Sequence, residues 1–79
     1  YAEGTDWYRA NQPFEWSGHR YHKKYPPRFI TPDELVHVGQ FRGVPVFASR
    51  GDSGTPISIL ALPVRPGCVF QLYEVSAGL

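Results

Sequence analysis

The stretch that decides the fold is ISILALPVRPGCVFQLYEV, residues 57–75. Its two runs, 57–64 and 68–75, are rich in aliphatic, β-branched and aromatic residues, which is typical of strands. Between the runs, Pro66 presets φ for the second turn position, and Gly67 supplies the positive φ that a type II turn requires next. The stretch therefore predicts a β-hairpin. Because residues 57–64 are apolar at nearly every position, we expect this strand to be covered on both faces.

Turn signals divide the rest of the chain into short segments. Residues 14–21 predict an aromatic strand interrupted by a turn or bulge at Ser17-Gly18. Residues 31–34, TPDE, have the form of a capping box and predict one helical turn that leads into a strand. Residues 44–48 predict a strand of a second hairpin, at an edge or with one side unpaired, because Pro45 lacks an amide hydrogen. Residues 22–28, which end near Pro26-Pro27, predict an extended polar connector.

Short strands at this spacing predict a mainly β fold, either a small antiparallel sheet or a partly open SH3-like barrel, with one short helical turn. We expect a single β-domain over residues 13–79, preceded by an irregular N-terminal arm over residues 1–12. The arm contains Trp7 and Tyr8 but has no strand period. Since nothing local is expected to bury these rings, we predict that the arm docks on a partner and that its deletion leaves the sheet intact.

Composition gives no positive sign of several classes of protein. Eight Lys and Arg residues stand against seven Asp and Glu, so the chain has no overall field of the kind found in nucleic-acid or membrane-surface binders. Cys68 is the only cysteine, so no internal disulfide forms. No apolar run is long enough to span a membrane. The chain begins at Tyr1 and has no methionine, which indicates either removal of a signal peptide, and hence an extracytoplasmic protein, or truncation.

Aromatic residues are the most informative pattern. The chain has five Tyr, five Phe and two Trp residues, most of them before residue 30. A domain this small has little room to bury them all, and interfaces favour Tyr and Trp. One interpretation is a protein-docking surface. The other is that the Phe and Trp residues form the core while the tyrosines lie at the surface.

Residues 19–28, HRYHKKYPPR, interleave basic and aromatic side chains. Phosphates pair with Arg and Lys, and unpaired bases stack on aromatic rings, so this segment also fits a nucleic-acid-binding barrel. The candidate partner-binding residues are Trp7, Tyr8, Arg20, Tyr21, Lys23, Lys24, Tyr25 and Arg28. A polar connector that covers one end of the barrel is the alternative interpretation.

Residues 51–56, GDSGTP, resemble the segment around the nucleophilic serine of chymotrypsin-like proteases, in which Gly stands in place of Thr55. Those enzymes need a histidine base oriented by a buried aspartate, on a fold of two β-barrels. This chain is too short for that fold, so we interpret Ser53 as part of a surface loop and predict no catalytic residue.

Three histidines and Cys68 are the only soft metal ligands. His19 and His22 would point to opposite faces of a strand, and no paired ligand spacing is present, so we predict no metal or other cofactor. The leading hypothesis is a non-enzymatic accessory or structural subunit that docks on other proteins, as a homo- or hetero-oligomer. A membrane surface would be reached only through a partner.

Overall fold

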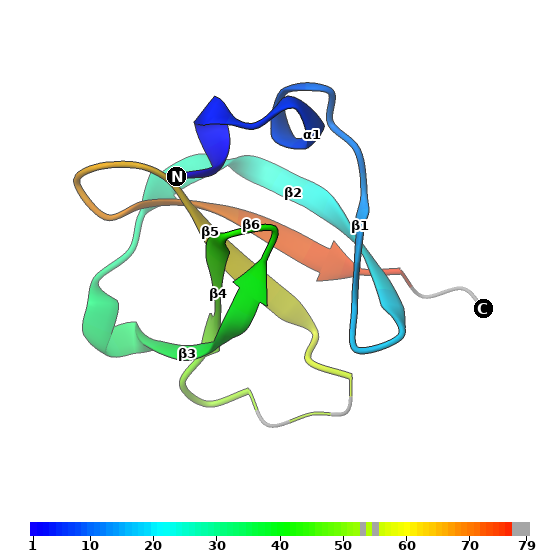
Figure 1. The fold of residues 1–79 in the computed structure, drawn as a ribbon. Helices are drawn as coiled ribbons and strands as arrows, with labels where there is room; N and C mark the ends of the chain where they lie inside the picture. Colours follow the sequence, from blue (N-terminus) through cyan, green and yellow to red (C-terminus); the bar gives the residue numbers. More distant parts are fainter. Residues whose placement is uncertain (53, 55, 77–79) are drawn as a thin grey trace.

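A single six-stranded antiparallel sheet forms the body of the computed structural model, which describes residues 1–52, 54 and 56–76. The strands follow the order β1-β2-β6-β5-β4-β3, and the sheet curls into a half-barrel (Figure 1). The predicted mainly β fold and partly open barrel are confirmed. The strands are β1 (Phe14–Trp16), β2 (His19–Phe29), β3 (Leu35–Phe41), β4 (Val44–Ser49), β5 (Ile59–Arg65) and β6 (Val69–Val75).

The predicted C-terminal hairpin is β5 and β6, which lie at the centre of the sheet. Gly67 has the expected positive φ of 96°. The turn is one residue longer than predicted, because Cys68 also has a positive φ, of 60°, and precedes β6 instead of starting it. A register shift between Pro63 and Arg65 leaves Val64 as an extra, fully buried residue that bends β5.

Both faces of β5 are buried, as its apolar run predicts. Leu60, Leu62 and Val64 face the concave side of the sheet, where the larger core cluster lies. Ala61 belongs to a second, smaller cluster on the other face. The larger cluster comprises Ala2, Trp7, Phe14, Tyr21, Val44, Val46, Leu60, Leu62, Val64 and Tyr73, and the smaller one comprises Ile30, Leu35, Ala61 and Phe70.

A two-residue turn joins β1 to β2, and it fits the predicted Ser17-Gly18 signal. Both residues have positive φ, 53° and 80°, as a type I′ hairpin turn requires. The predicted connector over residues 22–28 is wrong, because this segment continues β2 and pairs with β6. The Pro26-Pro27 pair is accommodated where the ladder is interrupted, between Lys24 and Arg28, so the missing amide hydrogens break no pairing.

The predicted helical turn is present as the 3-10 helix η2 (Pro32–Glu34). Its cap differs from a capping box: the Thr31 side chain caps no backbone amide, and its hydroxyl instead donates to the Glu34 carboxylate. The expectation for Pro45 is confirmed. β4 pairs with β5 only at Phe47 and Ala48, so Pro45 lies where β4 has no partner on that side.

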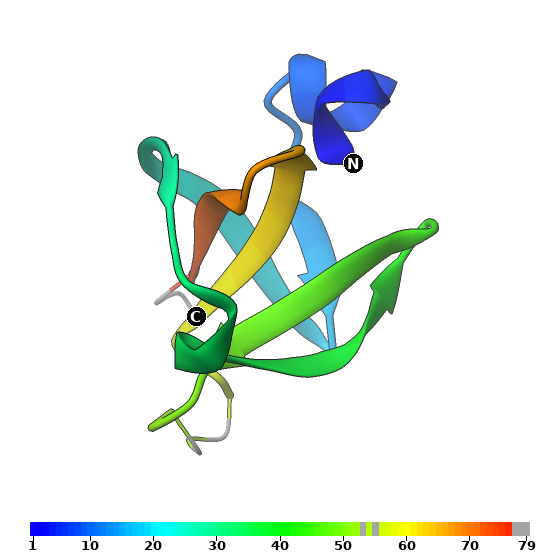
Figure 2. The same ribbon diagram turned by 90° about the vertical axis from the view of Figure 1, so that its left-hand side faces the viewer.

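The N-terminal segment is folded onto one end of the barrel as η1 (Ala2–Gly4) and α1 (Asp6–Arg9) (Figures 1 and 2). Ala2 is fully buried and Trp7 is 8% exposed, and both belong to the larger core cluster. The domain's own core therefore buries the Trp7 ring, contrary to the expectation that it is left for a partner. A short helix presents side chains with a different period from a strand, which a search for alternation misses. No helix in the described part of the chain is long and apolar enough to cross a membrane.

Tyr73 offers a test of the larger core. Its side chain is fully buried, and its hydroxyl has no hydrogen-bond partner among the described residues. We expect Tyr73→Phe to leave the free energy of unfolding unchanged or raise it by about 1 kcal/mol, because the substitution removes an unsatisfied polar group. Tyr21→Phe is the matched control, because the buried Tyr21 hydroxyl donates to the Ile57 carbonyl at 2.7 Å.

The free energy of unfolding of the control should fall by about 1 kcal/mol, since the substitution leaves the Ile57 carbonyl without this hydrogen-bond donor. Urea unfolding of both variants measures the difference. Equal destabilisation by the two substitutions would mean that the Tyr73 hydroxyl is satisfied in solution.

Candidate protein-docking surface

The structure divides the eight candidate partner-binding residues into three groups. Trp7 and Tyr21 are in the core. Tyr8 and Lys23 are half-buried and contact each other where α1 meets β2. The remaining four lie along β2, with Lys24 half-buried and the other three exposed: Arg20, Lys24, Tyr25 and Arg28.

Trp7 closes one end of the barrel. Its ring lies edge-on to Phe41 with the centroids 5.0 Å apart, and the Phe14 ring is 6.2 Å away. The centroid of the Phe14 ring lies 4.7 Å from that of Phe41 and 4.8 Å from that of Tyr73. These aromatic side chains link the N-terminal helix and β1 to β3 and β6. Trp7 therefore contributes its surface to the domain's own core.

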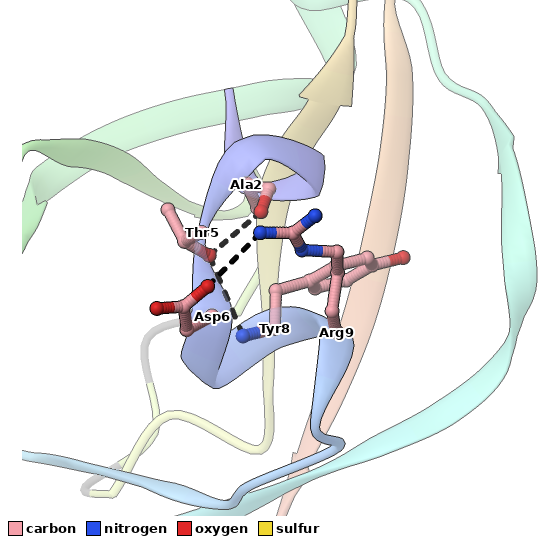
Figure 3. Close-up of polar contacts among 5 residues, drawn as sticks. All are labelled: Ala2, Thr5, Asp6, Tyr8 and Arg9. Atoms are coloured by element: carbon pink, nitrogen blue, oxygen red, sulfur yellow. Dashed lines mark hydrogen bonds and ion pairs between the residues drawn. The ribbon is translucent and has the colours of Figure 1, made fainter.

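Hydrogen bonds within the N-terminal segment give it a defined shape (Figure 3). The Thr5 hydroxyl donates to the Ala2 carbonyl at 2.7 Å and accepts from the Tyr8 amide at 3.4 Å, which caps α1. Arg9 pairs with Asp6 at 2.9 Å on the exposed side of the helix. The capping Thr explains why so short a segment forms a helix.

Lys23, on β2, binds the N-terminal segment through Tyr8 and Asn11. Its ammonium lies 3.6 Å from the centroid of the Tyr8 ring and donates to the Tyr8 carbonyl at 2.7 Å and to Asn11 Oδ1 at 2.6 Å. Burial lowers the pKa of Lys23. Burial also raises the pKa of Tyr8, and Arg65 and Glu3 exert smaller, opposing effects on it. Both candidate residues are thus engaged within the domain.

Gln71 is a buried polar residue that sequence reasoning missed. It is 2% exposed, and its Oε1 accepts from the Tyr8 hydroxyl at 3.1 Å. Its Nε2 donates to the backbone carbonyls of Lys24, Tyr25 and Leu72, with the shortest distance, 2.7 Å, to Tyr25. One side chain therefore holds both the N-terminal helix and the interrupted part of β2. A polar residue in the middle of the mostly apolar run 68–75 is the signal that would have identified it.

Two of the four Lys and Arg residues of β2 form ion pairs with neighbouring carboxylates. The Arg20 guanidinium lies 3.6 Å from the Glu15 carboxylate. The Lys24 ammonium lies 3.2 Å from the Glu74 carboxylate. Arg28 is exposed and forms no ion pair with any described residue. The segment is therefore less cationic than its sequence implies.

Two aromatic rings project from β2, one within its interrupted part and one just after it. Tyr25 and Phe29 are each 64% exposed. The backbone bulges between Lys24 and Arg28, and Tyr25 has a positive φ of 66°. We call the four exposed side chains Tyr25, Pro26, Arg28 and Phe29 the bulge surface. The interpretation that the Phe residues form the core is wrong for Phe29, and the exposure of Phe29 adds it to the candidate residues.

The other sequence candidates are not brought together. Ser53 lies outside the described residues, and the neighbouring Asp52 carboxylate accepts from the amides of Gly54 and Ser58 at 3.2 and 3.1 Å. His37, on β3, packs against Phe47 of β4, and His22 lies on β2, which is not a neighbour of β3 in the sheet. Within the described ranges, no group of three or more His, Cys, Asp and Glu residues could hold a metal ion.

Comparison with known proteins gives no relative: no family model, curated protein or solved structure matches this chain.

Proposed function

We propose that this domain is a non-enzymatic accessory or structural subunit that docks on other proteins through the bulge surface. The observation that carries the proposal is the pair of rings at Tyr25 and Phe29, each 64% exposed on a strand whose other aromatic, Tyr21, is buried. Aromatic and Arg side chains dominate the energetic centres of protein interfaces, and Arg28 lies between these rings in the sequence.

The anchoring of the bulge favours binding. The buried Gln71 side chain donates hydrogen bonds to the Lys24 and Tyr25 carbonyls and so fixes the backbone of the bulge. Pro26 and Pro27 restrict φ within the bulge. A surface that is already rigid loses little conformational entropy on association, so more of the contact energy appears as affinity. The partner this chemistry fits is an apolar protein groove bordered by a carboxylate for Arg28.

A nucleic-acid-binding barrel, the alternative prediction, gains less support. Arg20 and Lys24 already face carboxylates, and Lys23 is directed to the N-terminal segment. Arg28 alone would neutralise one phosphate, which gives weak binding. Binding of a single-stranded oligonucleotide with a steep salt dependence would favour this alternative instead.

The proposal is tested with the double variant Tyr25→Ser/Phe29→Ser in a pull-down from the native source, quantified by mass spectrometry. Loss of two interface aromatics should weaken partner binding by about 30-fold or more. The melting temperature should change little, because both rings are exposed. Tyr1→Ser is the matched control, since Tyr1 is 63% exposed and is not part of the bulge surface.

The double variant should lose the partners that the wild type and the control recover. If it retains the same partners in the same amounts, the bulge surface is not the docking site.

A further inference from the structure

The strands β4 and β5 are neighbours in the sheet but separate along part of their length. Among the described residues they pair at only two positions, of which Phe47 opposite Ala61 is the one nearer Pro45. An extension of this register would place Pro45 opposite Pro63. Neither proline has an amide hydrogen to donate, so the ladder ends before them. Figure 2 shows the two strands, in green and yellow, diverging from their paired ends toward the side where the N-terminus lies.

An apolar pocket of about 340 Å³ lies where the two strands separate. Phe70 is buried, and its ring stands edge-on to that of Phe47 with the centroids 5.7 Å apart. This volume falls in the range of sites that bind small molecules, which are mostly apolar and carry a few polar groups that orient the ligand. The pocket is lined by aromatic and proline side chains, completed by Arg65 and Cys68: Tyr1, Pro45, Phe47, Pro63 and Phe70.

Arg65 is the only charged residue among the described residues that line this pocket. Its side chain is exposed, and its Nη1 lies 3.8 Å from the Glu3 carboxylate, which is longer than a hydrogen bond. An exposed ion pair of this kind contributes little, so another anion can compete with Glu3. The planar guanidinium binds a carboxylate through two parallel hydrogen bonds. The pocket therefore combines apolar walls with one group suited to a carboxylate.

We propose that this pocket binds a small monocarboxylate with an aromatic or branched apolar body. The body lies against the two prolines and the rings of Phe47 and Phe70, and the carboxylate pairs with Arg65. A single positive charge among the described lining residues matches a single negative charge on the ligand. The bulge surface contributes none of these lining residues, so the ligand site is separate from the proposed protein-docking site.

The character of the walls favours a small molecule over a peptide segment. A peptide would bring backbone N–H and C=O groups against prolines and phenylalanines, which offer these groups no hydrogen-bond partners. A small carboxylate carries its polar atoms at one end, where Arg65 lies, and leaves its apolar body in the pocket.

Isothermal titration calorimetry with three compounds that share a phenylbutyl body tests the proposal. Phenylbutyrate should bind about tenfold or more tightly than phenylbutanol, because only the carboxylate forms charge-assisted hydrogen bonds with Arg65. Phenylbutylamine should bind most weakly, because its ammonium group would meet a like charge.

Substitutions of exposed residues identify the group that binds the carboxylate. Arg65→Gln should lower the affinity for phenylbutyrate to that for phenylbutanol and leave phenylbutanol binding unchanged. Glu3→Gln should raise the affinity for phenylbutyrate by about twofold or more, because it removes the carboxylate that competes for Arg65. Arg20→Gln is the matched control, since Arg20 is also exposed and lies 3.6 Å from Glu15, but on β2.

Cys68 provides a readout of where the compound binds. It is the only cysteine of the chain, it is half-buried, and it lines the pocket. Saturating phenylbutyrate should slow alkylation of Cys68 by iodoacetamide severalfold, whereas phenylbutylamine at the same concentration should leave the rate unchanged.

Three results would overturn the proposal. These are phenylbutyrate binding no tighter than phenylbutanol, a preference for the carboxylate that survives Arg65→Gln, and an alkylation rate unchanged at saturation. None of these measurements involves Tyr25 or Phe29, so the ligand site and the docking function fail separately.

Discussion

Replacing Trp7 with Ala is expected to lower the free energy of unfolding by about 3–5 kcal/mol. The ring is 8% exposed and lies 5.0 Å from the Phe41 ring, at the end of the larger core cluster. Its removal leaves a cavity that the short helix α1 is poorly placed to fill, because Lys23 holds that helix to β2. Urea unfolding followed by circular dichroism measures the change.

Tyr1→Ala is the matched control within the same segment. Tyr1 is 63% exposed, so this substitution should change the free energy of unfolding by less than about 0.5 kcal/mol. Deletion of residues 1–11 should likewise destabilise the sheet, which is opposite to the expectation from sequence. Equal, small effects of both alanine substitutions would mean that the N-terminal segment is not part of the core in solution.

Phe70→Ala should cost about 3–5 kcal/mol and Leu60→Ala about 2–5 kcal/mol. Leu60 is fully buried in the larger cluster, and Phe70 is 6% exposed in the smaller one. The Phe70 ring lies edge-on to Phe47 with the centroids 5.7 Å apart. The two substitutions therefore test the two faces of the β5–β6 hairpin separately in chemical denaturation.

Phe29→Ala removes the same side chain from an exposed site on the neighbouring strand. Phe29 is 64% exposed, so this variant should lie within about 0.5 kcal/mol of the wild type. If Phe70→Ala proved as mild as Phe29→Ala, the outer face of the hairpin would not be a core, and the smaller cluster would have no stabilising role.

The parts of the fold that depend on local pattern could be predicted. The β5–β6 hairpin follows from two apolar runs and the Pro66-Gly67 pair, and the helical turn η2 follows from residues 31–34. Pro45 lacks an amide hydrogen, which predicts that its strand is unpaired on one side at that residue, and β4 has no β5 partner there. Each of these signals lies within a few neighbouring residues.

The errors arose where distant residues decide the structure. Residues 22–28 look like a polar connector, but β6 supplies backbone partners for them, and Gln71 holds the bulge that contains Pro26 and Pro27. Trp7 looks unprotected because the rings that cover it, Phe14 and Phe41, lie on strands elsewhere in the chain. No local pattern encodes these contacts.

The candidate site shows the same division. Composition shows a surplus of aromatic residues, and the basic and aromatic pattern of residues 19–28 places most candidate residues on β2. Sequence alone did not separate the buried Tyr21 from the exposed Tyr25, because the bulge after Lys24 changes which face the later residues occupy. Phe29 became a candidate only through its exposure.

Hydroxyl-radical footprinting tests the docking claim most directly, because it compares the isolated domain with the same chain in its native assembly. We expect Tyr25 and Phe29 to react readily in the isolated domain, since each ring is 64% exposed, and to become protected in the assembly. Tyr1, with 63% exposure, should stay reactive in both. If Tyr25 and Phe29 react equally in the isolated and assembled states, the protein does not dock through the bulge surface.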